Sequence, residues 1–143
     1  MPFDEKFLRQ RFQEIMLELE IEQFVRNQEG LTNEVVIVNN RFVFRFAKTE
    51  AYTRILAAEI KNLDLVRPRI TIAIPTPIYH DEDCMIYPYL TGKPLQHVIV
   101  LSLDDRTESS IAKQLGEFLH GLHTTKIAGI DWIPPNVAPP GCC

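Results

Sequence analysis

The feature that most constrains the fold is a predicted β-hairpin, two strands joined by a two-residue turn. Val35–Val38 is a β-branched run, and Arg41–Phe46 alternates phenylalanines with other side chains. Asn39 and Asn40 between them can supply the left-handed conformations of a tight turn. Alternation places Phe42, Phe44 and Phe46 on one face of the second strand, and Arg41, Val43 and Arg45 on the other.

The rest of the chain alternates helical and extended segments. Apolar spacing predicts helices over 4–20, from Thr49 to about Val66, and after Ser102, with short strands at 22–28, 77–81 and 84–89. We therefore expect an α+β fold: an antiparallel sheet of about five strands, an N-terminal helix and a packed helix carrying Glu59. The expected divisions are a lobe over 1–92, the start of a helical lobe over 93–125, and an irregular tail over 126–143.

Composition narrows the functional classes. With 143 residues, 45% hydrophobic and 24% charged, the chain has the size and character of one soluble domain. Its net charge of -4 argues against a nucleic-acid partner. Its apolar runs are too short to cross a membrane, and its N-terminus does not have the pattern of a secretory signal. The three cysteines lack metal-type spacing, so we expect reduced thiols in a cytoplasmic protein.

Glu59 is the first candidate for chemistry. It shares the apolar face of its helix with Ile55 and Leu63, one turn away on either side. A partly desolvated carboxylate needs a cation, and the preceding strand offers Arg45. A guanidinium fixed in this way could also bind phosphate oxygens. The alternative is that Glu59 is half exposed and Arg45 solvated.

Two loops are weaker candidates. Gly30 could let backbone amides approach an anion, with Thr32 and Asn33 adding side-chain donors; the alternative is a plain turn. The segment Tyr87–Gly92 begins as a strand and loses regularity at a proline and a glycine. It could offer its own carbonyl and amide groups to a flat heterocycle, or simply close the sheet.

Taken in order, these segments resemble the N-terminal part of the aminoglycoside phosphotransferase family, which has a protein-kinase-like fold. The matching text is Gly-x-x-Asn-Glu-Val-x-x-Val, Phe-Val-Phe-Arg-Phe, Ala-Ala-Glu-Ile-x-x-Leu, Ile-Pro-Thr-Pro-Ile-Tyr, Tyr-Leu-Thr-Gly-Lys-Pro-Leu and Gln-Leu-Gly-Glu-Phe-Leu-His-Gly-Leu-His. It covers about two thirds of the chain, from Gly30 to His123.

The resemblance implies a role for each matching residue. Arg45 stands where the family has a basic residue, often Lys, that reaches nucleotide phosphates, and Glu59 is its helix partner. The loop Gly30–Asn33, with Thr32, would cover the phosphates. Tyr87 would border the base pocket, and the backbone of Pro88 and Leu90 would meet the purine edge. Arg in place of Lys keeps the charge but changes its geometry, which puts the phosphate contact of Arg45 in doubt.

The family's catalytic residues are not found. Phosphoryl transfer needs a His-x-Asp-x-x-x-x-Asn loop and a second, magnesium-binding Asp. The first has no match in the sequence, and Ile130–Trp132 follows the last helix too directly to be the second. His120 and His123 are interpreted as packing and helix-end residues rather than metal ligands. We therefore assign no catalytic or metal residue.

The resulting hypothesis is the nucleotide-binding lobe of a phosphotransferase. The full-length parent would transfer the γ-phosphate of ATP or GTP, with Mg²⁺, to a small-molecule hydroxyl such as that of an aminoglycoside. This chain alone is expected to be inactive, and its ending suggests truncation. Exposed Leu115, Phe118 and Leu122 would favour self-association. The alternatives are a non-catalytic nucleotide-binding or interaction module, and a generic α+β domain. The sequence does not choose between ATP and GTP, nor the acceptor.

Overall fold

The structure, a computed structural model, describes residues 3–27 and 30–126. Its elements are α1 (Glu5–Ile15), β1 (Phe24–Asn27), β2 (Asn33–Val38), β3 (Phe42–Ala47), α2 (Glu50–Val66), the 3₁₀ turn η1 (Arg67–Arg69), β4 (Tyr79–His80), β5 (Cys84–Pro88), α3 (His97–Val100) and α4 (Asp105–Thr124). The expected succession of helices and strands is confirmed, with η1 and α3 added. Ile130–Trp132, Cys142 and Cys143 lie outside the described residues, as does all of the expected tail beyond Lys126.

The central hairpin forms as the sequence predicts. Asn39 and Asn40 have φ angles of 52° and 51°, the left-handed values of the expected turn. The Asn39 side chain also fixes the incoming chain, because its Oδ1 accepts from the amides of Glu22 and Gln23 at 3.0 and 3.1 Å. The turn therefore sets both the register of β2 with β3 and the approach of the chain to β1.

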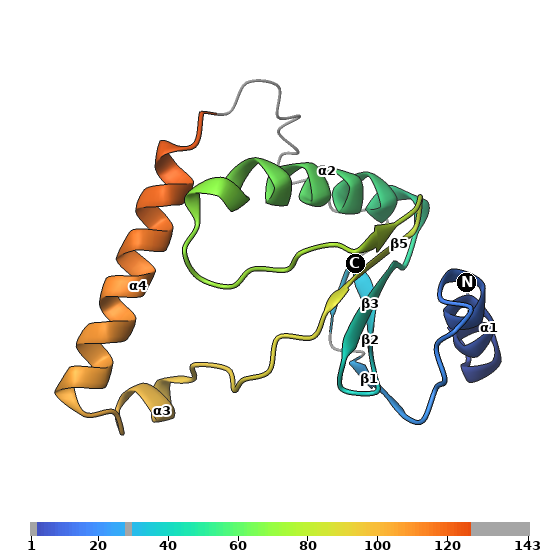
Figure 1. Ribbon diagram of the computed structural model, residues 1–143, viewed down its shortest axis with the longest axis horizontal. Coiled ribbons are helices and arrows are strands. Elements are labelled where there is room, and N and C mark those ends of the chain that lie inside the picture. The colour runs from blue at the N-terminus through green and yellow to red at the C-terminus, as the bar shows by residue number, and fades with distance from the viewer. Residues whose placement is uncertain (1–2, 28–29, 127–143) are drawn as a thin grey trace, which may run out of the picture.

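The five strands form one antiparallel sheet in the order β1-β2-β3-β5-β4. Figure 1 shows α1 on one side of this sheet and α2 on the other. The α+β fold class, with its five-stranded sheet and its packed helix carrying Glu59, is confirmed. The division of the chain at residue 92 stays a prediction.

The main core lies between α1 and the sheet. Alternate residues of β2, β3 and β5 meet one face of α1, so Phe44 and Phe46 of β3 are buried there and Phe42 is partly buried beside them. The buried side chains are Leu8, Phe12, Val36, Val38, Phe44, Phe46, Cys84 and Ile86. The rings of Phe12 and Phe44 lie 4.6 Å apart. Because each such ring contributes roughly 1.5–3 kcal/mol on burial, this face supplies much of the domain's stability.

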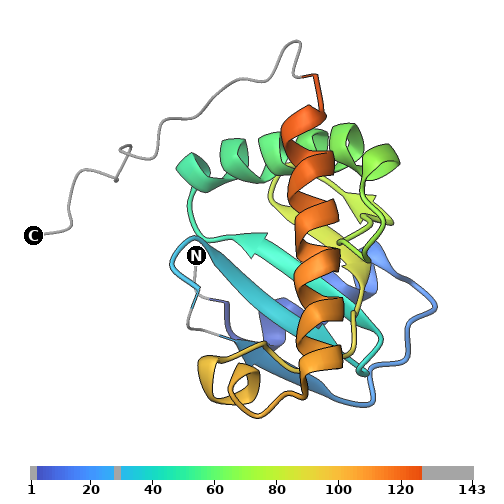
Figure 2. The ribbon, with the colours of Figure 1, turned by 90° about the vertical axis from the view of Figure 1, so that its left-hand side faces the viewer.

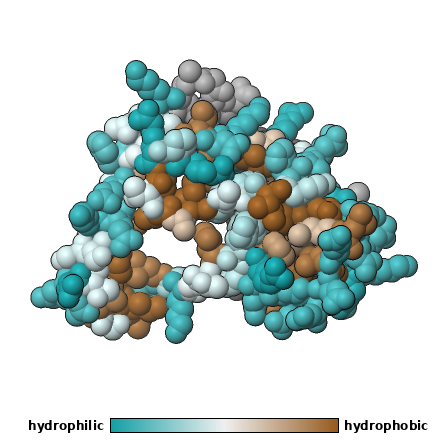
Figure 3. All heavy atoms as spheres, viewed as in Figure 1, coloured by the Kyte–Doolittle hydropathy of each residue, from teal (hydrophilic) through white to brown (hydrophobic). Residues whose placement is uncertain are grey.

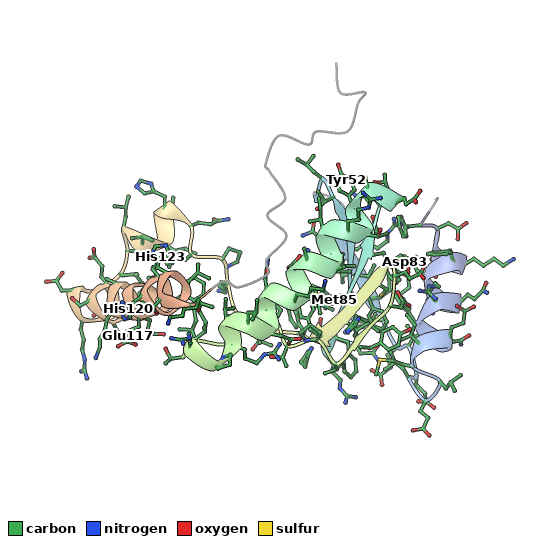
Figure 4. The ribbon with its side chains drawn as sticks, turned by 90° about the horizontal axis from the view of Figure 1, so that it is seen from above. Tyr52, Asp83, Met85, Glu117, His120 and His123 are labelled. Carbon is green, nitrogen blue, oxygen red and sulfur yellow. The ribbon has the colours of Figure 1, made fainter. Side chains whose placement is uncertain are left out.

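A charged cluster ties α1 to the turn between β4 and β5. Nη2 of Arg11 donates to Asp81 Oδ2 at 2.9 Å and to Asp83 Oδ1 at 3.0 Å. Asp83 lies at the α1 side of the sheet in Figure 4. Burial acts to raise the pKa of Asp81, but hydrogen bonds, first that of the Tyr79 hydroxyl, lower it overall. The pKa of Asp83 is raised by burial and by its neighbour Asp81. The cluster therefore holds α1 against residues about seventy positions further along the chain.

The second face of the sheet is covered only in part. Leu56 and Ile60 of α2 bury Met85 of β5, which is labelled in Figure 4, and Leu63 packs against the same cluster. Towards the β1 edge the face is open, since Val25 is 60% exposed. The sheet therefore leaves a partly apolar surface beside α2.

The last helix lies on the same side of the sheet as α2 (Figures 1 and 2). Its end meets η1 so closely that a Cβ added to Gly121 would overlap the Arg69 carbonyl oxygen. The helix expected after Ser102 begins at Asp105, and Ser102 does not cap it, because its hydroxyl donates to the Ile99 carbonyl of α3. Asp104 caps α4 instead, accepting from the Thr107 amide at 2.9 Å.

Apolar side chains are exposed along α3 and α4, as expected for this region. Leu115 and Leu119 are each 47% exposed and Leu122 is 36% exposed, whereas Phe118 is half-buried. Figure 3 shows apolar residues gathered over α3 and the start of α4, and an opening between α4 and the sheet. Among the described helices, none is long and apolar enough to cross a bilayer.

Candidate functional site

Arg45 of β3 and Glu59 of α2 form the predicted ion pair. Nη1 of Arg45 donates to Oε1 at 2.6 Å, and Nη2 donates to Oε2 at 2.9 Å. The side chains are 17% and 34% exposed, so the pair is largely withdrawn from water. Two parallel bonds of this kind fix the plane of the guanidinium as well as its position. The alternative of a solvated Arg45 is therefore wrong.

Local patterning explains why these two side chains meet. Arg45 pairs with Met85 in the register of β3 with β5, so both lie on the face that α2 covers. The buried Leu56 and Ile60 anchor α2 on that face, and Glu59 lies beside them on the helix. The helix thus brings a carboxylate to a strand position that carries a cation on this face.

The ion pair keeps Arg45 charged. Burial acts to lower the pKa of Arg45, but the hydrogen bonds and negative charge of Glu59 raise it overall. The two-bond contact uses one N–H on each terminal nitrogen, and a further hydrogen-bond interaction joins the guanidinium to the Tyr87 hydroxyl. The remaining N–H donors of the guanidinium could meet a second anion. The arrangement can therefore present a fixed positive charge to a ligand.

Tyr87 of β5 lies next to this pair. It pairs with Val43 in the sheet, which places it on the same face as Arg45. Its ring packs against the cluster of Leu56, Ile60 and Met85. Burial raises the pKa of Tyr87, and the charge of Arg45 partly offsets that rise. Tyr87 therefore borders the site as a neutral phenol, at the position where the sequence predicted a pocket wall.

The loop before β2 is compact and needs its glycine. A Cβ on Gly30 would lie 2.9 Å from the Asn33 carbonyl oxygen, closer than real side chains come. The Asn33 side chain is only 8% exposed, and its Nδ2 donates to Thr32 Oγ1 at 3.0 Å. Its Oδ1 is buried without a hydrogen-bond partner within the described part of the chain. Leaving a buried acceptor unpaired costs about 1–3 kcal/mol, so a hydrogen-bond donor from a ligand or from water would stabilise it.

Sequence reasoning missed Lys48, which holds this loop. The backbone amide of Lys48 donates to the Thr32 carbonyl at 3.0 Å, and its Nζ donates to the Gly30 carbonyl. The sequence did contain a signal for this contact. Pairing residues outward from the Asn39–Asn40 turn, one from each strand, places Lys48 opposite Thr32. The loop is thus braced by the end of β3.

Pro88 and Leu90 lie where β5 leaves the sheet. Pro88 pairs with Phe42, and the Tyr89 amide donates to the Arg41 carbonyl at 2.8 Å. In this register the Pro88 carbonyl points away from β3. Both Pro88 and Leu90 are exposed. The backbone here can therefore meet a ligand edge, as the resemblance implied.

The two backbone segments lie at opposite ends of β3. Phe42 marks the Pro88 end, and Ala47 pairs with Asn33 at the loop end. Five residue steps along a strand span about 17 Å. Arg45 lies between the ends, so the predicted residues are spread along one line on one face rather than gathered in a compact pocket.

A separate pocket of about 880 Å³ opens where residues of α1, the start of α2 and the turn before β5 meet. Its lining combines cationic side chains with the acidic turn between β4 and β5. The lining residues are Phe3, Arg11, Ala47, Lys48, Thr49, Glu50, Thr53, Arg54, Ala57 and Asp81–Asp83. None of the eight residues predicted for the site lines it. Among the described residues, the Arg45 face combines a fixed cation, an apolar surface and exposed backbone, so we take it as the candidate site.

Within residues 3–27 and 30–126, no group of three or more His, Cys, Asp or Glu side chains could hold a metal ion. Glu117, His120 and His123 lie along α4 (Figure 4), and both histidines are exposed.

Comparison with protein families gives a match over most of the chain. The family model described as the phosphotransferase enzyme family matches residues 23–139. The chain belongs to this family. The match includes the loop, the ion pair and the end of β5. A search of the curated proteins found no match.

Solved phosphotransferases share the fold. The complex of APH(2″)-IIIa with GDP and kanamycin has a TM-score of 0.76 at 24% identity, covering 85% of this chain and 43% of that one. ADP-bound aminoglycoside phosphotransferase APH(2″)-Ib has a TM-score of 0.73 at 16% identity, covering 87% and 41%. Apo macrolide 2′-phosphotransferase MphH from Brachybacterium faecium has a TM-score of 0.56 at 21% identity, covering 65% and 33%. The chain thus spans less than half the length of these family members.

Proposed function

We propose that this chain is the nucleotide-binding lobe of a phosphotransferase that moves the γ-phosphate of ATP or GTP to a small-molecule hydroxyl. The observation that carries the proposal is the two-bond Arg45–Glu59 pair, midway between a glycine-dependent loop and the open end of β5. Two of the similar structures hold GDP or ADP, which supports a nucleotide as the ligand.

The line of residues suits a long ligand with one flat end and one anionic end. At the β5 end, the Pro88 carbonyl and the Leu90 amide would bond the edge of the base, with Tyr87 as the neighbouring wall. The half-buried Val35 and Ile37 would lie under the ribose and base. About 17 Å further on, the loop would lie over the phosphates, with Arg45 on their near side.

Glu59 would act through Arg45. It holds the guanidinium in one orientation, so a phosphate meets a donor that is already ordered. The backbone amides of the loop Gly30–Asn33 would add hydrogen bonds to the phosphate oxygens. The buried, unpaired Asn33 Oδ1 would gain a partner from a ligand-bound water or donor group.

This lobe would bind and orient the nucleotide without completing the reaction. When bound, Mg²⁺ would neutralise charge on the transferring phosphate. The 143 residues contain no His-x-Asp-x-x-x-x-Asn segment to position an acceptor hydroxyl. We therefore expect nucleotide binding but no phosphate transfer by this chain alone. The identity of the acceptor depends on residues outside the described site.

The test is a calorimetric titration of the chain with ATP and with GTP, with and without Mg²⁺. Loss of a charge-assisted contact predicts that Arg45→Ala weakens binding by about tenfold or more. Arg9→Ala is the matched control, since it removes the same charge from α1 on the opposite side of the sheet and should bind like the wild type. Failure of the wild-type chain to bind either nucleotide would remove the proposal.

We also propose that copies of the chain self-associate through α4. Leu115, Leu119 and Leu122 recur at helical spacing and are all substantially exposed. Sedimentation velocity at increasing concentration should detect dimers or larger species, and Leu115→Lys with Leu119→Lys should reduce them. A monomer at every concentration would contradict this.

A further inference from the structure

The contacts of Lys48 with the loop before β2 are not explained by the ion pair. One residue makes two hydrogen bonds to the loop: its amide to the Thr32 carbonyl and its Nζ to the Gly30 carbonyl. Among the residues of 3–27 and 30–126 that lie outside the loop, Lys48 alone bonds both carbonyls. The half-buried Lys48 side chain is therefore committed to the loop backbone.

Lys48 reaches the loop from the side opposite Arg45. Successive side chains of an extended strand alternate between faces, so Lys48 follows Phe46 onto the α1 face. Lys48 also lines the pocket to which Phe3 and Arg11 contribute from the α1 side and Glu50 and Thr53 from α2. Its ammonium thus lies behind the loop as seen from the proposed ligand.

The bond from Nζ determines which way one amide of the loop points. In a planar trans peptide the carbonyl and the following N–H point in opposite directions. Drawing the Gly30 carbonyl towards Nζ of Lys48 therefore turns the N–H group of Leu31 away from Lys48, whereas the Thr32 carbonyl is held in the plane of the sheet by the Lys48 backbone amide. An amide turned in this way can donate to an anion.

We propose that Lys48 is a positioning residue for the phosphate-binding loop: its ammonium holds the Gly30 carbonyl from behind and so presents the amide of Leu31 to the nucleotide phosphates. The inference rests on the proposed nucleotide-binding function. It assigns to Lys48 an action through the backbone, with no direct contact to the nucleotide. The loop's affinity for phosphate then depends on a side chain on the far face of the sheet.

The test compares Lys48→Met with the wild-type chain, using the nucleotide that the wild type binds and the matching nucleoside without phosphates. Loss of the brace should weaken triphosphate binding on the order of tenfold and leave nucleoside binding within about twofold. Amide hydrogen exchange at residues 30–33, measured without nucleotide, should become faster by a similar factor. Lys48→Arg should restore much of both properties, since its guanidinium can still donate to a carbonyl.

Lys61→Met is the matched control, because Lys61 is exposed on α2 and the change in charge and length is the same. It should leave all three measurements unchanged. Lys48→Gln provides a second neutral variant should Lys48→Met fail to fold.

The outcomes separate this inference from the proposed function. If the wild type binds the triphosphate and Lys48→Met binds it equally well, or loses nucleoside affinity to the same extent, the inference is overturned. Unchanged exchange in the loop also overturns it. If the wild type binds no nucleotide, the proposed function fails and the phosphate role fails with it; faster loop exchange would then leave Lys48 as a structural brace only.

Discussion

Removing one or both partners of the Arg45–Glu59 ion pair by substitution gives the sharpest test of the site's geometry. Glu59→Gln removes the negative charge at nearly constant shape and leaves a guanidinium that is only 17% exposed without its counter-charge. Arg45→Met removes the cation but keeps an apolar stem on the strand. The double variant removes both charges at once, so the three proteins and the wild type form a thermodynamic cycle.

The expected magnitude lies between two known limits. Breaking a fully buried pair costs about 3–5 kcal/mol, and breaking an exposed pair costs about 0.2–1 kcal/mol. Because Glu59 remains 34% exposed, solvent screens part of the interaction. We expect Glu59→Gln to lower the free energy of unfolding by about 1–2 kcal/mol, with a coupling energy of about 1–2 kcal/mol between the two sites. The double variant should therefore be more stable than the sum of the single changes predicts.

Urea denaturation followed by circular dichroism measures all four free energies of unfolding. The control cycle uses Lys113 and Glu117 on α4, which are 3.9 Å apart and 78% and 50% exposed. Its coupling energy should stay below about 0.5 kcal/mol. If the coupling between Arg45 and Glu59 is no larger than that of the control, the pair does not hold the guanidinium, and the proposed site loses its fixed cation.

Three further predictions use the same assay. Asn40→Gly should stabilise the fold by about 0.5 kcal/mol, because φ is positive at Asn40 and glycine adopts such values without strain; a loss of stability would contradict this. Gly121→Ala should destabilise by about 1–3 kcal/mol, since its Cβ overlaps the Arg69 carbonyl, whereas Gly116→Ala, with open space around it, should stabilise by up to about 1 kcal/mol; equal effects would refute the contact. Burial acts to raise the pKa of Asp81, but hydrogen bonds lower it overall, so its ionised form is favoured in the folded state. The stability that it contributes is present above the unfolded pKa and is lost as pH falls, so Asp81→Asn should cost stability near neutral pH and progressively less in acid; a pH-independent difference would contradict this.

Much of the fold was predictable because its signals are local. The two asparagines of the hairpin turn, the alternation along β3 and the helical spacing before and after Glu59 each act over a few residues. The Arg45–Glu59 pair followed from the same patterns, because a carboxylate on an apolar helix face needs a cation and the adjoining strand supplies one. The resemblance to the phosphotransferases added the roles of the loop and of the end of β5, and these roles stay predictions.

The sequence by itself therefore determined the hairpin, the order of elements and the two charges that meet across strand and helix. Only the tertiary structure decided that Arg11 joins α1 to the turn at Asp81, that Gly121 lets α4 approach η1, and that Lys48 braces the loop from the opposite face. Those contacts join residues far apart in the chain or depend on which peptide groups face each other. They arise from how completed elements pack, and no short-range pattern of side chains encodes that packing.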